Sequence, residues 1–315
     1  GLGDVYKRQS YAMGDYVGAE PGTLTFVTAT DGNHGRGVAW AAARMGMKSV
    51  VYMPKGTARE RLERIRALGA DASITEMNYD DTVRFARKQA ERHGWILIQD
   101  TAWDGYTEVP ARIMQGYMTM ADEAAEQLGE KRPTHVFLQA GVGSMAAAVA
   151  AYYVNRYGEK NRPVLTVVEP QQADCFFRTA RAADGALHAV SGDLSTIMAG
   201  LACGEVNPLA WEILKECTDY FVSIPDWVAA LGMRILAAPL AQDPRVISGE
   251  SGAAPLGLAA WLLQRGRKGS DFQREWKERL GINQDSVLLF ISTEGATDLE
   301  NYRRVVWDGA YPMPV

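Results

Sequence analysis

The stretch of residues 28–37 (TATDGNHGRG) constrains the fold more than any other part of the chain. It follows residues 24–28 (LTFVT), whose β-branched and aromatic side chains predict a buried strand, and precedes an alanine-rich run at 38–45 that predicts a helix. The first turn of a helix leaves backbone N–H groups unpaired, and the helix dipole favours negative charge there. The arrangement therefore predicts an α/β unit whose turn binds an anion or a polar ring substituent. Asp31 and Asn33 either face that site or simply cap the helix.

Predicted strands and helices alternate from residue 24 onwards, and this alternation favours parallel sheets flanked by helices with right-handed crossovers. In the first part, strands are expected at 24–28, 48–53, 72–77 and 96–99, and helices at 35–46, 58–68 and 79–93. In the second part, helices are expected at 109–128, 146–153, 208–217, 226–240 and 254–265, and strands at 135–139, 164–168 and 287–291. The segment 171–207 is rich in glycine and is expected to be loop that lines a site.

This alternation predicts two α/β domains, because a long helix separates two strand-and-helix units. We place the smaller domain at residues 22–105 and the larger one, which would hold the cofactor, at 106–315. Residues 1–9 (GLGDVYKRQ) show no strand or helix period and differ in character from the rest of the chain. We expect them to be a non-native segment that contributes nothing to the fold.

Composition argues against several classes of partner. A net charge of −5 without long runs of lysine or arginine disfavours nucleic acid and anionic membranes. No apolar stretch approaches the roughly 20 residues that span a bilayer, and no secretion signal is visible. Cys175, Cys203 and Cys217 lack metal-ligand spacing, and their low, odd number fits reduced thiols in a cytoplasm. Cys175 and Cys203 are expected to approach each other near the site entrance as free thiols.

A second glycine-rich turn, residues 141–146 (GVGSMA), again lies between a predicted strand and a predicted helix. The spacing Gly141, Gly143, Ala146 is a permissive form of the dinucleotide fingerprint, with Glu169 ending the next strand. The same turn also suits a nest of N–H groups that holds a single phosphate. The residues alone leave both possibilities open.

Eight segments together resemble the diaminopropionate ammonia-lyases, which belong to the pyridoxal-phosphate enzymes of fold type II (tryptophan synthase β-like). The similarity extends over residues 22–308, and Asp31 before the Gly-Asn-His-Gly element and Asp100 in QDTAW are typical of this lyase group. The resemblance favours pyridoxal 5'-phosphate over a nucleotide. The segments are DGNHGRGVAWAA, VVYMPKG, NYDDTVR, QDTAW, LQAGVGSM, TIMAGLACGE, ISGESGA and ISTEG.

The resemblance implies roles for the residues around the cofactor. Asn33 would bind the phenolic oxygen of the cofactor, and Ser292 would face its pyridine nitrogen, with Thr293 as the nearest rival. Without the family, Ser292 is better explained as a strand-end hydroxyl that bonds a backbone group. The phosphate would lie on the second glycine-rich turn: Gly141, Val142, Gly143, Ser144 and Met145.

The resemblance also implies two catalytic carboxylates. Asp31 would be the base for the D-isomer of the substrate, and Asp100 would assist the amine side. The alternatives are that Asp31 caps a helix and that Asp100 caps the element after its strand. His34 is expected to pack at the helix start, and Lys55, Arg59 and Arg61 are expected on a solvated face.

One departure from the family concerns a lysine. Fold-type II enzymes hold the cofactor as a Schiff base on a lysine, which also serves as the base for the L-isomer. In the family that lysine precedes the Gly-Asn-His-Gly element by several tens of residues, whereas here 30 residues precede Asp31 and Lys7 is their only lysine. Lys7 lacks the following glycines, so we do not assign it this role. We expect the sequence to be truncated at its N-terminus, and the chain as given to be inactive.

The predicted function is pyridoxal-phosphate-dependent α,β-elimination of D- and L-2,3-diaminopropionate to pyruvate and ammonia, a step of amino-acid catabolism. A cytoplasmic homodimer without a metal site is expected. Three alternatives stay open: a serine or threonine dehydratase of the same fold type, an NAD-dependent oxidoreductase, and a non-catalytic binding protein derived from the lyase.

Overall fold

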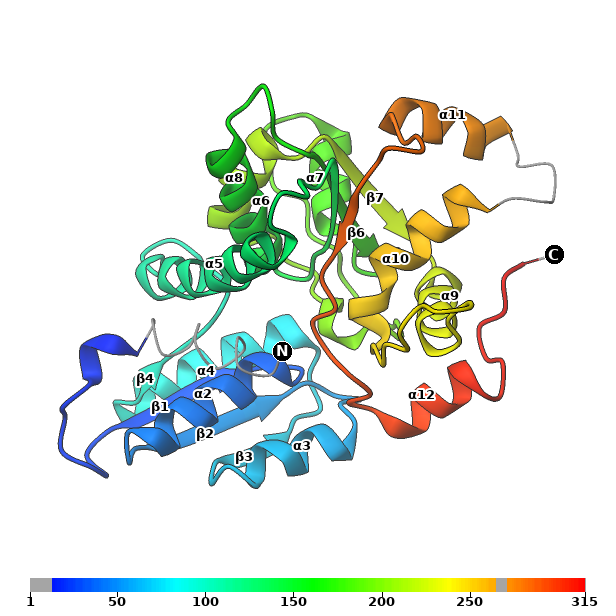
Figure 1. The fold of residues 1–315 in the computed structure, drawn as a ribbon. Helices are drawn as coiled ribbons and strands as arrows, with labels where there is room; N and C mark the ends of the chain where they lie inside the picture. The colour runs from blue at the N-terminus through cyan, green and yellow to red at the C-terminus, as the bar shows by residue number, and fades with distance from the viewer. Residues whose placement is uncertain (1–12, 265–270, 315) are drawn as a thin grey trace.

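The computed structural model describes residues 13–264 and 271–314, and it contains two sheets that lie in separate halves of the molecule (Figure 1). Each sheet has four strands, and every strand pairing within them is parallel. The predicted α/β class, with parallel sheets flanked by helices, is therefore confirmed. Lys7 and the segment 1–9 lie outside the described residues.

The first sheet has the strand order β3-β2-β1-β4. Successive side chains of its central strand point to opposite faces, as the two-residue period requires. Phe26 packs with the helix that follows β1, whereas Val27 packs with the helix on the other face. The elements are β1 (Thr25–Ala29), α2 (Asn33–Arg44), β2 (Lys48–Met53), α3 (Arg59–Arg66), β3 (Asp71–Ile74), α4 (Tyr79–His93) and β4 (Ile96–Leu97).

The second sheet has the order β7-β6-β5-β8, with β5 (His135–Gln139) buried along its whole length. One face packs on α5 (Glu108–Leu128), α6 (Ser144–Tyr157) and α8 (Pro208–Cys217). The other face packs on α9 (Asp226–Ala237) and α10 (Glu250–Leu263). The remaining elements are η1 (Gly14–Tyr16), β6 (Val164–Pro170), α7 (Cys175–Ala182), η2 (Ala199–Leu201), β7 (Tyr220–Ile224), α11 (Asp271–Leu280), β8 (Leu288–Phe290) and α12 (Leu299–Val306).

Two segments connect the sheets. Helix α5 contributes Ile113 to the core of the first sheet and Met114 to that of the second. After β8, the chain runs from the second sheet towards the first and enters α12 (Figure 1). Residues 292–297 of this segment line the cavity.

Several elements differ from the expectation. Segment 171–207 contains α7, which the sequence missed because its N-terminal N–H groups bond the carboxylate of Glu169, at the end of the preceding strand. The short strand β7 and the helices α11 and α12 were not predicted either. Helix α10 begins at Glu250 rather than 254 and contains Pro255 in its interior.

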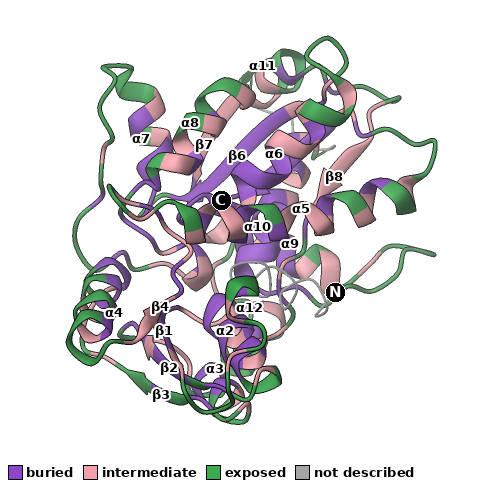
Figure 2. Cartoon of the chain, turned by 90° about the vertical axis from the view of Figure 1, so that its left-hand side faces the viewer, coloured by how far each residue is buried: buried purple, intermediate pink, exposed green. Residues whose placement is uncertain are grey.

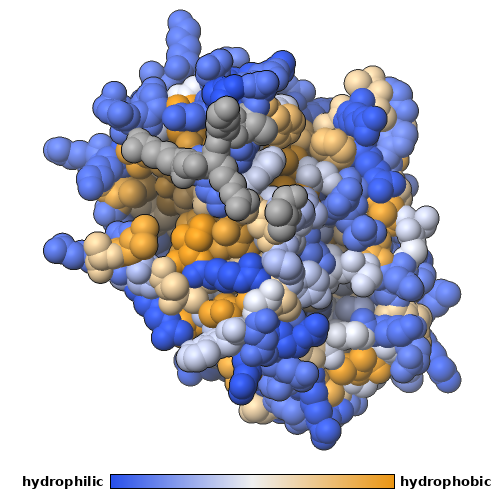
Figure 3. Space-filling model, turned by 90° about the vertical axis from the view of Figure 1, so that its right-hand side faces the viewer, coloured by the Kyte–Doolittle hydropathy of each residue, from blue (hydrophilic) through white to orange (hydrophobic). Residues whose placement is uncertain are grey.

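Apolar side chains lie mainly inside the molecule, and polar side chains lie mainly on its surface. Buried residues concentrate on the strands and on the inner sides of the helices, with exposed ones on the outer sides (Figure 2). Figure 3 shows one face where hydrophobic side chains gather among hydrophilic ones. No helix in the described part of the chain has the length and apolar character to cross a membrane.

Candidate active site

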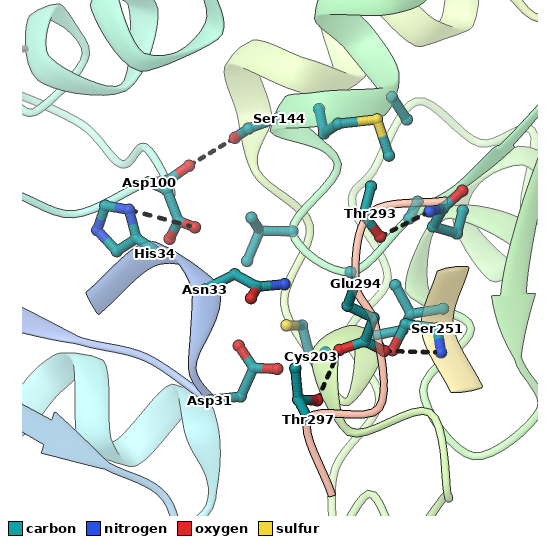
Figure 4. A pocket seen from close by; sticks show the side chains of 18 of the residues that line it. Asp31, Asn33, His34, Asp100, Ser144, Cys203, Ser251, Thr293, Glu294 and Thr297 are labelled. Carbon is teal, nitrogen blue, oxygen red and sulfur yellow. Dashed lines mark hydrogen bonds and ion pairs between the residues drawn. The ribbon is translucent and has the colours of Figure 1, made fainter. Parts of the chain in front are cut away.

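A cavity of about 660 Å³ lies between the sheets, within the size range of small-molecule sites (Figure 4). Its lining comes from the segments that follow β1, β4, β5 and β8, where the carboxyl ends of parallel strands place ligand-binding groups. All of the predicted site residues line this one cavity: Asp31, Asn33, Asp100, Gly141, Val142, Gly143, Ser144, Met145 and Ser292.

The turn after β1 directs Asp31 and Asn33 into the cavity. The hydroxyl of Thr30 accepts hydrogen bonds from the N–H groups of Gly32 and Gly35, at 2.9 and 3.0 Å. A Cβ atom on Gly35 would lie 2.2 Å from Cγ2 of Thr30, so this tight turn requires glycine there. The N-cap of α2 is Gly32, and the side chain that accepts from a first-turn N–H of this helix is that of Thr30, not Asp31 or Asn33. Asp31 and Asn33 are thus free of the capping role that was the alternative.

Asp31 lies in a strongly charged environment. Its carboxylate is 3.6 Å from the guanidinium of Arg61, and its side chain is 24% exposed. Burial raises the pKa of Asp31 to about 6; Arg61 opposes this rise, whereas Glu294 and Asp100 add to it. Asp31 therefore changes its protonation state near neutral pH, a property suited to a general base.

Arg61 is not on a solvated face, so that expectation was wrong. Its side chain is only 7% exposed and points between the sheets, where its Nη2 lies 3.5 Å from Glu294 and 3.9 Å from Glu250. Arg59, two residues earlier on α3, is exposed as expected. Arg61 precedes the buried residues Leu62 and Ile65 by one and four positions, so it lies on the buried side of α3, where it contacts groups from both sheets.

Asp100 has neutral hydrogen-bond donors around it. Oδ1 accepts from the hydroxyl of Tyr79 at 3.1 Å and from Nε2 of Gln99 at 3.0 Å. Burial, aided by Asp100, raises the pKa of Tyr79 well above its usual range, so this hydroxyl remains a donor. Among the described residues no backbone N–H donates to the Asp100 carboxylate, so it is not a cap.

His34 is buried at the start of α2, as expected for a packed residue. One ring nitrogen, Nε2, lies 2.8 Å from the carbonyl oxygen of Ile98. The other, Nδ1, lies 3.9 Å from Oδ2 of Asp100 (Figure 4). His34 therefore borders the Asp100 carboxylate on the side away from Tyr79.

The second glycine-rich turn forms a cradle at the N-terminus of α6. Gly143 has φ of +88°, and a Cβ atom there would lie 2.3 Å from the ring of Phe176. First-turn N–H groups have no partner within a helix, and across the described residues nothing else accepts from the N–H groups of Val142 to Met145. These free donors at a helix N-terminus fit a phosphate.

Glu169 does not support the dinucleotide alternative. It is fully buried, and its carboxylate accepts hydrogen bonds from the N–H groups of Phe176 and Phe177, at 2.9 and 2.6 Å. Burial raises its pKa to about 8, despite those two hydrogen bonds. A carboxylate that caps α7 in this way is not available to bind a ribose.

Ser292 and Thr293 follow β8 and both line the cavity. The hydroxyl of Ser292 donates to that of Ser248 at 2.9 Å, while its distance to the Glu294 carbonyl oxygen is 3.5 Å. The hydroxyl of Thr293 accepts from Nε2 of Gln139 at 2.9 Å (Figure 4). Ser292 therefore lines the cavity and also makes the backbone bond that was its alternative.

Several residues that line the cavity were not predicted from the sequence. Tyr79, Gln139, Ser251 and Glu294 all line it, although none was assigned a role. Ser251 and Glu294 belong to the glycine-flanked segments ISGESGA and ISTEG, which were noted only as similar to the family. The residues after Tyr79 were interpreted only as the acidic first turn of a helix, so Tyr79 itself was given no role.

The cavity has no lysine among its described lining residues. Cys203 lines it and is buried, as is Cys175 on α7, and both are free thiols. Burial raises the pKa of each thiol well above its usual range. Cys217 is half-buried and also free.

Comparisons with known proteins place these features in context. The family model for pyridoxal-phosphate dependent enzymes matches residues 8–272. Diaminopropionate ammonia-lyase of Escherichia coli strain K12 is 54% identical over 292 residues, which are 92% of this chain and 71% of the relative.

Two crystal structures of the Escherichia coli diaminopropionate ammonia-lyase match most of the chain. The complex with D-serine has a TM-score of 0.88 and 48% identity, covering 99% of this chain and 80% of that one. The complex with an aminoacrylate-PLP azomethine reaction intermediate has a TM-score of 0.87 and 49% identity, covering 98% of this chain and 79% of that one.

Proposed function

The chain belongs to the pyridoxal-phosphate-dependent enzymes and, within them, to the diaminopropionate ammonia-lyases, and we propose its chemistry from that premise. It eliminates ammonia from 2,3-diaminopropionate. The Cα–H and Cβ–N bonds break, a Cα=Cβ bond forms, and water converts the released enamine to pyruvate and a second ammonia. The cofactor is pyridoxal 5'-phosphate.

The residues that line the cavity fit this cofactor. The cavity is large enough for a small molecule, and the turn Gly141–Met145 offers unpaired N–H groups at a helix N-terminus. We assign the phosphate to this turn, the phenolic oxygen to Asn33 and the pyridine nitrogen to Ser292. A neutral hydroxyl at that nitrogen does not hold it protonated, and this suits elimination rather than transamination.

When bound, pyridoxal phosphate withdraws electrons from the substrate Cα and makes its proton more acidic. The protein must then supply a base for that proton. Asp31 is our candidate for the D-isomer, since its carboxylate lines the cavity and its pKa of about 6 leaves it mostly ionised at pH 7. The ionised form accepts the proton, and burial favours its transfer to the carboxylate.

The departing amine needs a proton, because an amine leaves poorly unless it is protonated. We assign this side of the substrate to Asp100. Tyr79 and Gln99 occupy Oδ1 of its carboxylate, so Oδ2 is left to bind the β-amine. The two carboxylates thus divide the work through different surroundings.

The base for the L-isomer is the lysine that binds the cofactor, as the family implies. Since the described lining of the cavity includes no lysine, that residue is to be sought outside the described residues, where Lys7 is one candidate. Reduction of the loaded protein with borohydride, followed by peptide mass spectrometry, would locate the modified lysine. Lys7→Ala abolishing the modification would assign the role to Lys7.

We also propose a homodimer that works in the cytoplasm and contains a smaller domain, 22–105, and a larger one, 106–315. All strands of the first sheet fall within the first range, and those of the second sheet within the other. The homodimer and the cytoplasmic location are what the resemblance to the family implies.

The observation on which the proposed function chiefly rests is that Asp31, Asn33, Asp100 and the 141–145 turn line one cavity. The test supplies the protein with pyridoxal phosphate and either isomer of 2,3-diaminopropionate, and follows pyruvate through a coupled lactate dehydrogenase. The assay compares the 315-residue chain with a version that includes any coding sequence recovered upstream. Absence of pyruvate from both versions, with the cofactor bound, would overturn the proposal.

A further inference from the structure

The side chain of Arg61 lies between the two sheets and faces three carboxylates. Its Nη1 lies 3.6 Å from Oδ2 of Asp31 and 3.4 Å from the Asp31 carbonyl oxygen. Its Nη2 lies 3.5 Å from Glu294 and 3.9 Å from Glu250. Asp31 follows the first sheet, whereas both glutamates belong to segments that pack on the second.

This cluster has more acidic groups than one cation can balance. Glu250 and Glu294 are both buried, and burial, with Glu294 next in importance, raises the pKa of Glu250 to about 6. Buried carboxylates that share one site cannot all ionise readily. The Arg61 guanidinium, which contacts all three carboxylates, therefore stabilises their ionised forms.

We propose that Arg61 is a positioning residue that holds the Asp31 carboxylate in the cavity and keeps it ionised, by pairing it with Glu294 and Glu250 across the sheets. The inference rests on the proposed function, in which Asp31 removes the Cα proton of the D-isomer. Arg61 acts through Asp31, and Figure 4 shows Asp31 and Glu294 pointing into the same cavity.

Arginine suits this position better than lysine does. Its guanidinium is a rigid fork, so Nη1 contacts Asp31 while Nη2 contacts both glutamates of the other sheet. A lysine ammonium is a single point charge and cannot pair with both sides in this geometry. Arg61→Lys should therefore keep the charge but restore the function only in part.

The charge of Asp31 depends on groups from several elements. Arg61 stabilises its ionised form, whereas Glu294 and Asp100 oppose that form. Opposite effects are thus expected when Arg61 or Glu294 loses its charge. Arg36 on α2 and Arg64 on α3 line the same pocket as Asp31, Arg61 and Glu294. The other groups that face Asp31 or Arg61 are Tyr79 on α4, Asp100 after β4, Cys203 after η2, Glu250 on α10, and Glu294 and Asp298 after β8.

The test measures kcat/KM for the D-isomer against pH in the enzyme with its cofactor. Arg61→Met should shift the acid limb of this profile to higher pH by about one unit or more, giving roughly a tenfold loss at pH 6 that recovers at higher pH. Glu294→Gln should shift the limb in the opposite direction. Arg59→Met removes an exposed arginine of the same helix and should leave the limb in place.

A second readout does not depend on turnover. Protein labelled with ¹³C at aspartate carboxyl carbons is titrated by NMR, and the Asp31 signal is assigned by its loss in Asp31→Asn. The midpoint of that signal should rise in Arg61→Met and fall in Glu294→Gln. Circular dichroism verifies folding, and if Arg61→Met fails to fold, Arg61→Lys and Glu294→Gln still provide the test.

The two proposals fail in different ways. If the wild-type enzyme releases no pyruvate from either isomer, the proposed function is wrong, while the NMR titration still reports on Arg61. If the wild type is active but the limb and the NMR midpoint stay within about 0.3 pH units in Arg61→Lys and Glu294→Gln, Arg61 does not set the charge of Asp31. A fall of activity at all pH values without a shift would likewise indicate a structural role only.

Discussion

Asp31 and Asp100 follow two neighbouring strands of the same sheet, yet their surroundings differ. Asp31 lies against the buried cation Arg61 and close to Glu294, and its pKa is raised to about 6. Asp100 accepts hydrogen bonds from the neutral donors Tyr79 and Gln99. Burial and nearby charges shift the pKa of Asp31, and the two neutral donors orient the Asp100 carboxylate. The comparison explains how one sheet edge can provide both a base and an amine-binding group.

The largest effect is expected from removing the base. Asp31→Asn should lower kcat/KM for the D-isomer by roughly 10²–10⁴-fold, the usual contribution of general-base catalysis, and should affect the L-isomer far less. The coupled pyruvate assay measures both. Equal losses for the two isomers would make Asp31 a positioning residue. Asp31 and Asp100 would then not differ in function as proposed.

Removing the Asp100 carboxylate should cause a smaller loss of activity that is equal for the two isomers. Asp100→Asn should lower kcat for both isomers by about 10²-fold, because the β-amine must leave from either of them. The same assay with both isomers gives the ratio. A loss restricted to one isomer would show that Asp100 also discriminates at Cα.

The pH dependence of kcat/KM should also distinguish Asp31 from Asp100. The base must be ionised, so kcat/KM for the D-isomer should fall about tenfold per pH unit below the Asp31 pKa of about 6 and level off above it. Profiles between pH 5 and 8 measure this limb. The residual activity of Asp31→Asn should lack it; if the limb persists in that variant, it belongs to another group.

The smallest loss of activity is expected from removing one hydrogen bond to Asp100. Tyr79→Phe removes the 3.1 Å hydrogen bond to Asp100 but leaves that from Gln99. The net value of one hydrogen bond is about 0.5–1.5 kcal/mol, so kcat should fall about two- to tenfold for both isomers. Phe85→Leu, elsewhere on α4, controls for packing changes in that helix, and a loss as large as that of Asp100→Asn would mean that Tyr79 itself reacts.

The sequence predicted the parts of the site that depend on local structure. Asn33 and Gly143 lie in turns between a strand and a helix, and such turns are recognised from adjacent residues alone. Asp100 was assigned through the resemblance of QDTAW to the family, and its place after a predicted strand agrees with that assignment. These residues meet in one cavity because parallel strands end at the same edge of each sheet.

The parts that depend on distant contacts were not predicted. Arg61 was placed in solvent because arginine is usually exposed, whereas in the structure it pairs with Asp31, Glu250 and Glu294, which are distant in the sequence. Helix α7 likewise depends on Glu169 of the preceding strand for its N-terminal bonds. Contacts of this kind arise from tertiary packing, which has no local pattern in a single sequence.

The hydroxyl of Ser144 donates a hydrogen bond to the Asp100 carbonyl oxygen at 2.5 Å, and this bond connects the two sheets. Ser144 begins the helix behind the glycine cradle and also accepts from Asn207, so the cradle is tied to the backbone of the opposite sheet. On the other flank, Arg61 meets its glutamates at 3.5 and 3.9 Å, distances typical of looser ion pairs. The two sheets are therefore joined by a direct hydrogen bond at Ser144 on one flank of the cavity and by the longer ion pairs of Arg61 on the other.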